Sequence, residues 1–176
     1  MSFTHVGPAT GITELESQTL PHGRFYKLPD GFWVPSVTTV TGHQSKQGIL
    51  DWEKRVGFTE AQKIRNAASW RGTKYHGLVE FYLNNELEKI EKSEGFPVYL
   101  FRASRSTLDR IGPIHCLETP LYSARLGIAG RVDCIAEFDG ELAVIDFKTT
   151  KTLKKVEWLE KFFVQEAAYA YMYYEL

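Results

Sequence analysis

The dipeptide Asp139-Gly140 separates two apolar runs, and it constrains the fold more than any other feature of the chain. Aspartate followed by glycine tolerates the positive φ angles of a two-residue type I′ turn, which joins antiparallel strands. Residues 127–138 and 141–149 are therefore predicted to form a hairpin. Counting back from the turn along both strands places Asp133 directly opposite Asp146.

The side chains at the open end of this hairpin indicate a metal site. Two directly opposed carboxylates lie roughly 4.5 to 5.5 Å apart and repel each other unless a proton or a cation lies between them. Because side chains alternate along a strand, Lys148 shares a face with Asp146, while Phe147 points away and leaves its carbonyl oxygen free as a ligand. Oxygen ligands beside an ammonium group suit Mg²⁺ or Mn²⁺ and a phosphate substrate. The alternative is a strand-end charge at Asp133 and a solvated pair of Asp146 and Lys148.

Four motifs follow one another in an order that resembles a known family. They are the run 35–40, Gly72-Thr73-x-x-His76-x-x-x-Glu80, the pair Gly130-x-x-Asp133 and Asp146-x-Lys148-Thr149, and Gln165-x-x-x-Tyr169. Together they resemble the PD-(D/E)XK nuclease superfamily, and within it the RecB-like exonuclease branch, which includes mitochondrial and phage-encoded enzymes. The resemblance covers most of the chain, although the proline in the superfamily's name is absent here.

The resemblance implies an α/β (α+β) fold with a restriction-endonuclease-like core, in which helices flank a central mixed sheet. From the residues themselves, 1–22 are expected to be irregular, and an amino-terminal hairpin is expected around Pro29-Asp30-Gly31. The expected elements are strands 24–28 and 32–41, helical residues from about 47 to 83 with interruptions at Gly57 and Gly72, a helix at 96–110, antiparallel strands 114–123, 127–138 and 141–149, and a helix at 156–174.

The resemblance also assigns roles outside the hairpin. It places His76 with Asp133, Asp146 and the Phe147 carbonyl as metal ligands, and it gives the catalytic set Asp133, Asp146, Lys148, Gln165 and Tyr169. His76 and Glu80 share a helical face, so a surface histidine paired with a glutamate is the alternative. Gln165 and Tyr169 can each donate a hydrogen bond to a phosphate or a catalytic carboxylate, unless Tyr169 belongs to the apolar core. Glu118, on the preceding strand, is as readily an ordinary strand charge as a supporting residue.

Basic residues near these motifs are the candidate DNA contacts. Lys151, Lys154 and Lys155 follow the catalytic strand, and Arg71 and Lys74 flank the histidine motif. Trp70, Tyr75 and Trp158 are candidate stacking platforms for single-stranded DNA. The alternatives are that the cationic side chains are simply solvated at the surface and that the aromatic rings pack in the core.

Composition limits the class of protein. The 176 residues fit one domain, and similar exonucleases continue beyond the last helix, so a carboxy-terminal strand could be lacking. A net charge of −1 argues against coating of nucleic acid by bulk electrostatics. Two cysteines exclude a disulfide framework, a zinc cluster and a four-cysteine iron-sulfur cluster. With no apolar run of membrane-spanning length and no targeting segment, a cytoplasmic protein of a bacterium or phage-infected cell is expected.

These features predict a metal-dependent DNA exonuclease that uses Mg²⁺ or Mn²⁺ and, by resemblance, prefers single-stranded ends. Replication or recombination proteins are candidate partners, and the oligomeric state is left open. An endonuclease or junction resolvase on the same fold is one alternative. A non-catalytic nucleic-acid-binding module is another, although the presence of both acids and the lysine argues against a degenerate site.

Overall fold

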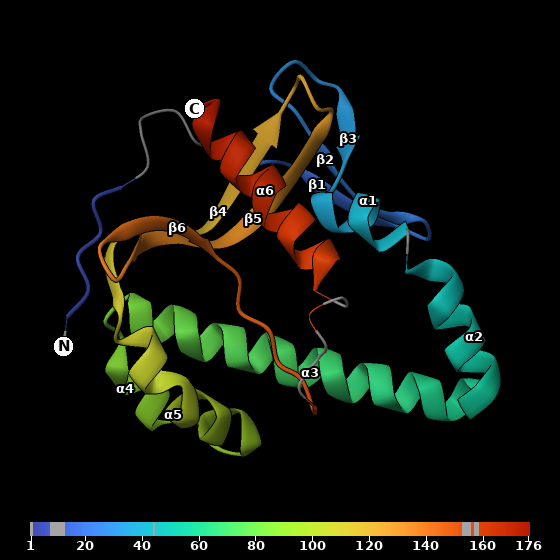
Figure 1. Ribbon diagram of the computed structural model, residues 1–176, viewed down its shortest axis with the longest axis horizontal. Coiled ribbons are helices and arrows are strands. Elements are labelled where there is room, and N and C mark those ends of the chain that lie inside the picture. Colours follow the sequence, from blue (N-terminus) through green and yellow to red (C-terminus); the bar gives the residue numbers. More distant parts are fainter. Residues whose placement is uncertain (1, 8–12, 44, 153–155, 157–158) are drawn as a thin grey trace.

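The computed structural model describes all residues except 1, 8–12, 44, 153–155 and 157–158. The described residues form two sheets and six helices, and Figure 1 shows the helices around the sheets. The first sheet contains β1 (Ser17–Leu20), β2 (Gly23–Lys27) and β3 (Trp33–Pro35), and the second contains β4 (Ile111–Ser123), β5 (Ile128–Phe138) and β6 (Glu141–Ile145). The helices are α1 (Val37–His43), α2 (Lys46–Val56), α3 (Phe58–Leu83), α4 (Leu87–Glu91), α5 (Phe96–Leu108) and α6 (Glu160–Tyr174). This arrangement confirms the predicted α/β class and agrees with a restriction-endonuclease-like core.

The strand pairing differs in one detail from the mixed sheet that the resemblance implied. Both ladders formed by the described residues are antiparallel. Parallel contact between the described residues is limited to two isolated bridges, His5 with Ile114 and Ser36 with Ala129. The second bridge connects the amino-terminal sheet region to β5.

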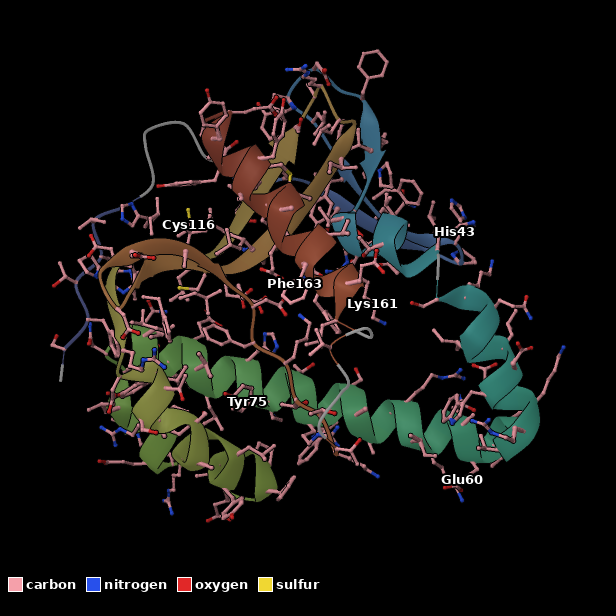
Figure 2. All side chains as sticks on the ribbon, in the orientation of Figure 1. His43, Glu60, Tyr75, Cys116, Lys161 and Phe163 are labelled. Carbon is pink, nitrogen blue, oxygen red and sulfur yellow. The ribbon has the colours of Figure 1, made fainter. Side chains whose placement is uncertain are left out.

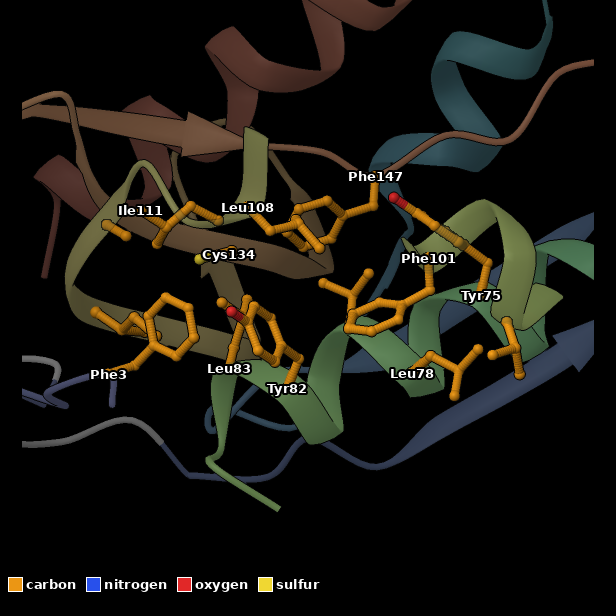
Figure 3. Packing of buried hydrophobic residues seen from close by; sticks show 14 residues of the cluster. Phe3, Tyr75, Leu78, Tyr82, Leu83, Phe101, Leu108, Ile111, Cys134 and Phe147 are labelled. Carbon is orange, nitrogen blue, oxygen red and sulfur yellow. The ribbon is translucent and has the colours of Figure 1, made fainter. Parts of the chain in front are cut away.

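The second sheet lies between two helical layers. On one face, residues of α3 and α5 such as Tyr75 and Phe101 pack with Cys134 of β5 and with Phe147, as Figure 3 shows. On the other face, Met172 of α6 and Val37 of α1 pack against Ile135 of the same strand. Because both faces are covered, charged groups of this sheet are expected mainly at its edges and strand ends.

Glycine has different effects at its two positions in the long helical region. Gly57 has a φ of 84° and separates α2 from α3, as predicted. The predicted interruption at Gly72 is wrong, because α3 continues through it to Leu83. A Cβ at Gly72 would lie 3.9 Å from the Thr149 hydroxyl, an ordinary van der Waals contact, so the segment after β6 passes beside the helix at this point.

Three expectations at the amino-terminal side and in the helical region need correction. The strand expected to reach residue 41 ends at Pro35, and α1 follows because the Ser36 hydroxyl accepts the Thr39 amide hydrogen at 3.0 Å, a helix-capping contact. The region 1–22 is not wholly irregular, since β1 pairs with β2. The short helix α4 was not expected.

The strand predicted to span 141–149 is shorter than expected, because β6 ends at Ile145. The amide of Phe147 donates to Asp133 Oδ2 at 2.9 Å, so a side chain takes the amide that the strand ladder would otherwise use. The chain then leaves the sheet and runs towards α3 (Figure 1). No helix in the described part of the chain has the length and apolar character needed to cross a membrane.

Candidate active site

The hairpin between β5 and β6 has the predicted turn and register. Asp139 and Gly140 have φ angles of 53° and 88°, and the flanking residues Phe138 and Glu141 pair. The expected pairs Ile135–Val144 and Glu137–Leu142 are also present. The ladder stops at Cys134–Ile145, one position before Asp133 and Asp146. The two aspartates therefore lie at the open end of the hairpin, where Asp146 has already left the strand.

A third carboxylate reaches Asp133 from the opposite neighbouring strand. Glu118 of β4 lies between Leu117 and Thr119, which pair with the residues on either side of Asp133. Glu118 has an unusual φ of 47°, and its carbonyl accepts a hydrogen bond from the Arg131 guanidinium. The irregular backbone of β4 thus places an acid beside Asp133.

His76, Glu118 and Asp133 form a group that could hold a metal ion. One ligand atom from each lies within 4.8 Å of the other two, and His76 Nδ1 lies 3.6 Å from Asp133 Oδ2. The residues come from α3, β4 and β5, so the group forms only in the folded chain. Glu118 was not predicted as a ligand, and Asp146, which was, does not belong to this group of three.

The electrostatics of this group favour a cation. Burial, together with the nearby charges of Asp133 and Glu80, raises the pKa of Glu118 to about 7, although Arg131 opposes the shift. Burial also raises the pKa of Asp133, although His76 and the Phe147 amide oppose the shift. Carboxylates that repel one another in a desolvated site become stable as anions when a divalent cation compensates them. The donor set of two carboxylates and an imidazole therefore fits a divalent metal.

Asp146 is held beside this group by two donors. Gln165 of α6 donates from Nε2 to Asp146 Oδ1 at 2.9 Å, and the Lys148 ammonium contacts the same oxygen. Gln165 is buried, so its amide has little freedom to turn away. The structure thus contains a hydrogen bond from the Gln165 amide to the carboxylate of Asp146, one of the candidate site residues.

Comparison with known proteins decides the family. A sequence profile of the PD-(D/E)XK nuclease superfamily matches residues 43–176. The chain belongs to this superfamily. Mitochondrial genome maintenance exonuclease 1 from Xenopus tropicalis is 28% identical over 149 residues, which cover 84% of this chain and 38% of the relative. The human protein of the same name is 26% identical over 130 residues, which cover 69% of this chain and 38% of the human protein. The PD-(D/E)XK chain thus spans less than half the length of these relatives.

Tyr169, predicted as a catalytic residue of this PD-(D/E)XK chain, lies in the core. It is 4% exposed and packs with Val132 and Met172 between α6 and the sheet. Burial raises its pKa, and the nearby Asp133 raises it further. A Cβ built at Gly130 would lie 2.7 Å from the Tyr169 hydroxyl, so the glycine of the Gly-x-x-Asp motif makes room for the tyrosine.

Replacing Gly130 with alanine is expected to lower the free energy of unfolding by about 1–3 kcal/mol, because the added methyl group overlaps the Tyr169 hydroxyl. Removing that hydroxyl in the double variant with Tyr169→Phe should recover part of the loss. Urea denaturation measures both. Gly77→Ala is the matched control, since its Cβ would meet nothing within 4 Å. A Gly130→Ala variant as stable as the wild type would contradict the close packing.

The predicted DNA contacts are distributed more widely. Lys151 is exposed and follows Lys148 by three residues, whereas Lys154, Lys155 and Trp158 lie outside the described residues. Residues two apart on a helix do not share a face, so Lys74 and His76 lie on different sides of α3. Lys74 and Trp70 line a separate cavity of about 430 Å³ against α5. Arg71 is half-buried on the same helix.

The third aromatic candidate, Tyr75, is not an exposed stacking platform. It is 8% exposed and belongs to the core cluster of Figure 3. Its hydroxyl donates to the Ser104 hydroxyl of α5 at 2.9 Å. Tyr75 therefore supports the packing of α3 on α5 immediately before His76.

A further acid, Glu166, lies beside the site and was not predicted. With Asp146 and Lys148 it lines a cavity of about 400 Å³ between α6 and the segment after β6. Both of its carboxylate oxygens are shielded from solvent, and neither has a hydrogen-bond partner among the described residues. Burial, together with the nearby charge of Asp146, raises the pKa of Glu166 to about 7, although Lys148 opposes the shift. Its position directly after Gln165 gave no separate signal in the sequence.

Proposed function

We propose that this chain is a metal-dependent DNA exonuclease that hydrolyses phosphodiester bonds at single-stranded ends. The observation that carries the proposal is the convergence of His76, Glu118 and Asp133 next to Asp146 and Lys148. Membership of a nuclease superfamily supports the same chemistry. The preference for ends rests on the motif resemblance and on relatives whose name includes "exonuclease".

Each residue has a role that follows from its place. His76, Glu118 and Asp133 would hold Mg²⁺ or Mn²⁺, with Asp146 and the Phe147 carbonyl as further oxygen ligands. When bound, the cation would supply positive charge to the scissile phosphate and would lower the pKa of the water that attacks it. Lys148 would orient that water and add positive charge where the transition state becomes more negative.

Gln165 has a positioning role in this scheme, because its hydrogen bond restricts the rotation of the Asp146 carboxylate. Tyr169 would support the same helix face from the core, in contact with Gly130. Together they would keep α6 and the end of the hairpin in one arrangement while DNA binds.

The binding surface and context are part of the proposal. Residues 1–176 would form a single nuclease domain, and Lys151, Lys154, Lys155, Arg71 and Lys74 would contact the DNA backbone outside the cleavage centre. Replication or recombination proteins are the proposed class of partner. The cytoplasm of a bacterium or phage-infected cell stays the predicted setting.

Digestion of linear and circular single-stranded DNA tests the proposal. With Mg²⁺, an end-labelled linear strand should shorten progressively, whereas a covalently closed circle of the same sequence should stay intact because it has no end. Omitting Mg²⁺ and adding a chelator provides the control. Cleavage of the circle would indicate an endonuclease, and bound but unshortened linear DNA would indicate a binding module.

A further inference from the structure

Lys148 borders another cavity, which lies between α5 and the segment after β6. Its volume is about 290 Å³, close to the lower end of small-ligand sites at about 300 Å³. The segment contributes Lys148, Thr149 and Thr150, and α5 contributes Leu100 and Ala103. Tyr75 of α3 also lines this cavity, and Figure 2 shows it between α3 and α5. The cavity is therefore adjacent to a residue that would act on the scissile phosphate.

The charges around the two cavities at Lys148 differ. The cavity beside α6 has two acids, Asp146 and Glu166, in its lining. The described residues that line the cavity beside α5 include one cation, Lys148, and no acid. Arg102, which is exposed on α5, adds a further positive charge to this helix. A sugar-phosphate backbone is anionic, so a strand that reaches Lys148 is expected to continue on the α5 side.

The apolar wall of this cavity continues into an exposed stripe along α5. The stripe, here called the α5 stripe, has the i, i+3, i+4, i+7 spacing of one helical face and consists of Phe96, Tyr99, Leu100 and Ala103. Leu100 and Ala103 line the cavity. Phe96 and Tyr99, towards the amino-terminal end of the helix, are 58% and 67% exposed. Large apolar side chains that gather on one exposed face indicate a surface that contacts another molecule.

The two rings of the α5 stripe have the arrangement of a base-stacking platform. The ring centroids of Phe96 and Tyr99 lie 6.1 Å apart, and the ring planes are 16° from parallel. A nucleobase can extend such a stack, and any base can do so because each has an aromatic face. These faces are accessible in a single strand, whereas base pairs cover one another in a duplex. A single strand that passes Lys148 would thus place its phosphates beside the cations and its bases on the stripe.

We propose that the α5 stripe holds single-stranded DNA next to the scissile phosphate, with bases stacked on Phe96 and Tyr99 and the backbone beside Lys148 and Thr149. The inference rests on the proposed nuclease function for its biological meaning. Its physical content is base-dependent binding of a single strand, which is measurable without cleavage.

Fluorescence anisotropy of a labelled single strand tests the platform, with a chelator present to prevent cleavage. Tyr99→Ala and Phe96→Ala should each weaken binding about tenfold, because each removes a ring on which a base stacks. Tyr99→Phe retains the ring and should bind the strand like the wild type. Phe32→Ala is the matched control, because Phe32 is a similarly exposed aromatic residue, at 72%, directly before β3. It should also keep the wild-type affinity.

An abasic strand of the same length separates stacking from contacts to the backbone. It has phosphates but no bases, so the wild type should bind it more weakly than the normal strand. Tyr99→Ala should weaken this binding no further, because no stacking remains to be lost. An equal loss of affinity for the normal and the abasic strand in Tyr99→Ala would overturn the proposal.

The outcomes separate this inference from the proposed function. Metal-dependent DNA cleavage by the wild type, with unchanged DNA affinity in both alanine variants, would leave the nuclease function standing and refute the platform. Base-dependent binding through Phe96 and Tyr99 without any cleavage would do the reverse. If light scattering showed that Tyr99→Ala dissociates an oligomer while DNA affinity is unchanged, the α5 stripe would be a contact between protein chains and the proposal would be wrong.

Discussion

Replacing Asp133 with asparagine is expected to lower the rate of Mg²⁺-dependent DNA cleavage by about 10²–10³-fold. Asp133 is the central member of the group with His76 and Glu118, and asparagine removes its negative charge. The asparagine side-chain oxygen can still accept the Phe147 amide, so the segment after β6 should keep its place. Single-turnover digestion of a labelled strand measures the rate, and Mn²⁺ titration by calorimetry should show affinity reduced by at least about tenfold.

Asp51→Asn is the matched control for this change. Asp51 is an exposed acid of α2 that accepts a hydrogen bond from Gln47 at 3.0 Å, far along the chain from the site. The variant should bind Mn²⁺ and cleave DNA like the wild type. If Asp133→Asn also behaved like the wild type in both assays, Asp133 would not be a metal ligand.

Replacing Lys148 with alanine is expected to lower the same cleavage rate by about 10²–10³-fold while leaving Mn²⁺ affinity nearly unchanged. The lysine contributes a proton donor and a positive charge, and it contacts Asp146 without belonging to the metal-binding group. A loss of rate without a loss of metal affinity distinguishes it from Asp133. Single-turnover kinetics at saturating Mg²⁺, paired with calorimetry, separate the two effects.

Lys161→Ala tests whether loss of any nearby lysine has the same result. Lys161 Nζ lies 5.3 Å from the centre of the Phe162 ring, and Lys148 Nζ lies 5.7 Å from it. Lys161 instead donates to the Ser45 hydroxyl, at 3.4 Å. Its replacement should leave the cleavage rate near that of the wild type. Equal effects of the two substitutions would indicate a general electrostatic contribution rather than a specific role for Lys148.

The hairpin could be predicted from sequence because its information is local. Asp139-Gly140 determines the turn type, and once the turn is known the pairing of β5 with β6 follows residue by residue. The same reasoning could not predict that β6 ends at Ile145. That end depends on the Asp133 side chain accepting the Phe147 amide, a contact between residues 14 apart in sequence.

The place of Glu118 in the group with His76 and Asp133 could not be predicted in this way, because its position depends on an irregular strand. The β4–β5 ladder shifts register between Ile111 and Ile114 and again between Ile114 and Cys116. Glu118 itself has a positive φ angle, and a glutamate gives no sign of this in the sequence, as a glycine or asparagine would have done. Counting along β4 from sequence therefore gives no reliable partner for Asp133.

The helix contacts were partly predictable. The four-residue spacing places Gln165 and Tyr169 on one face of α6, but it does not distinguish a donor to Asp146 from a residue packed against Gly130. The two-residue spacing between Lys74 and His76 likewise places them on different faces of α3. The strand expected beyond Pro35 was wrong because a single serine hydroxyl starts α1 within a run rich in β-branched residues.

Cleavage of DNA by this chain is expected to require a divalent cation held at Asp133. The most direct measurement is Mg²⁺ titration with an end-labelled linear single strand, comparing the wild type with Asp133→Asn. The wild type should shorten the strand in proportion to metal occupancy, and the variant should do so at least about a hundredfold more slowly. Unchanged DNA length at saturating Mg²⁺ and Mn²⁺, or equal cleavage by the two proteins, would contradict it.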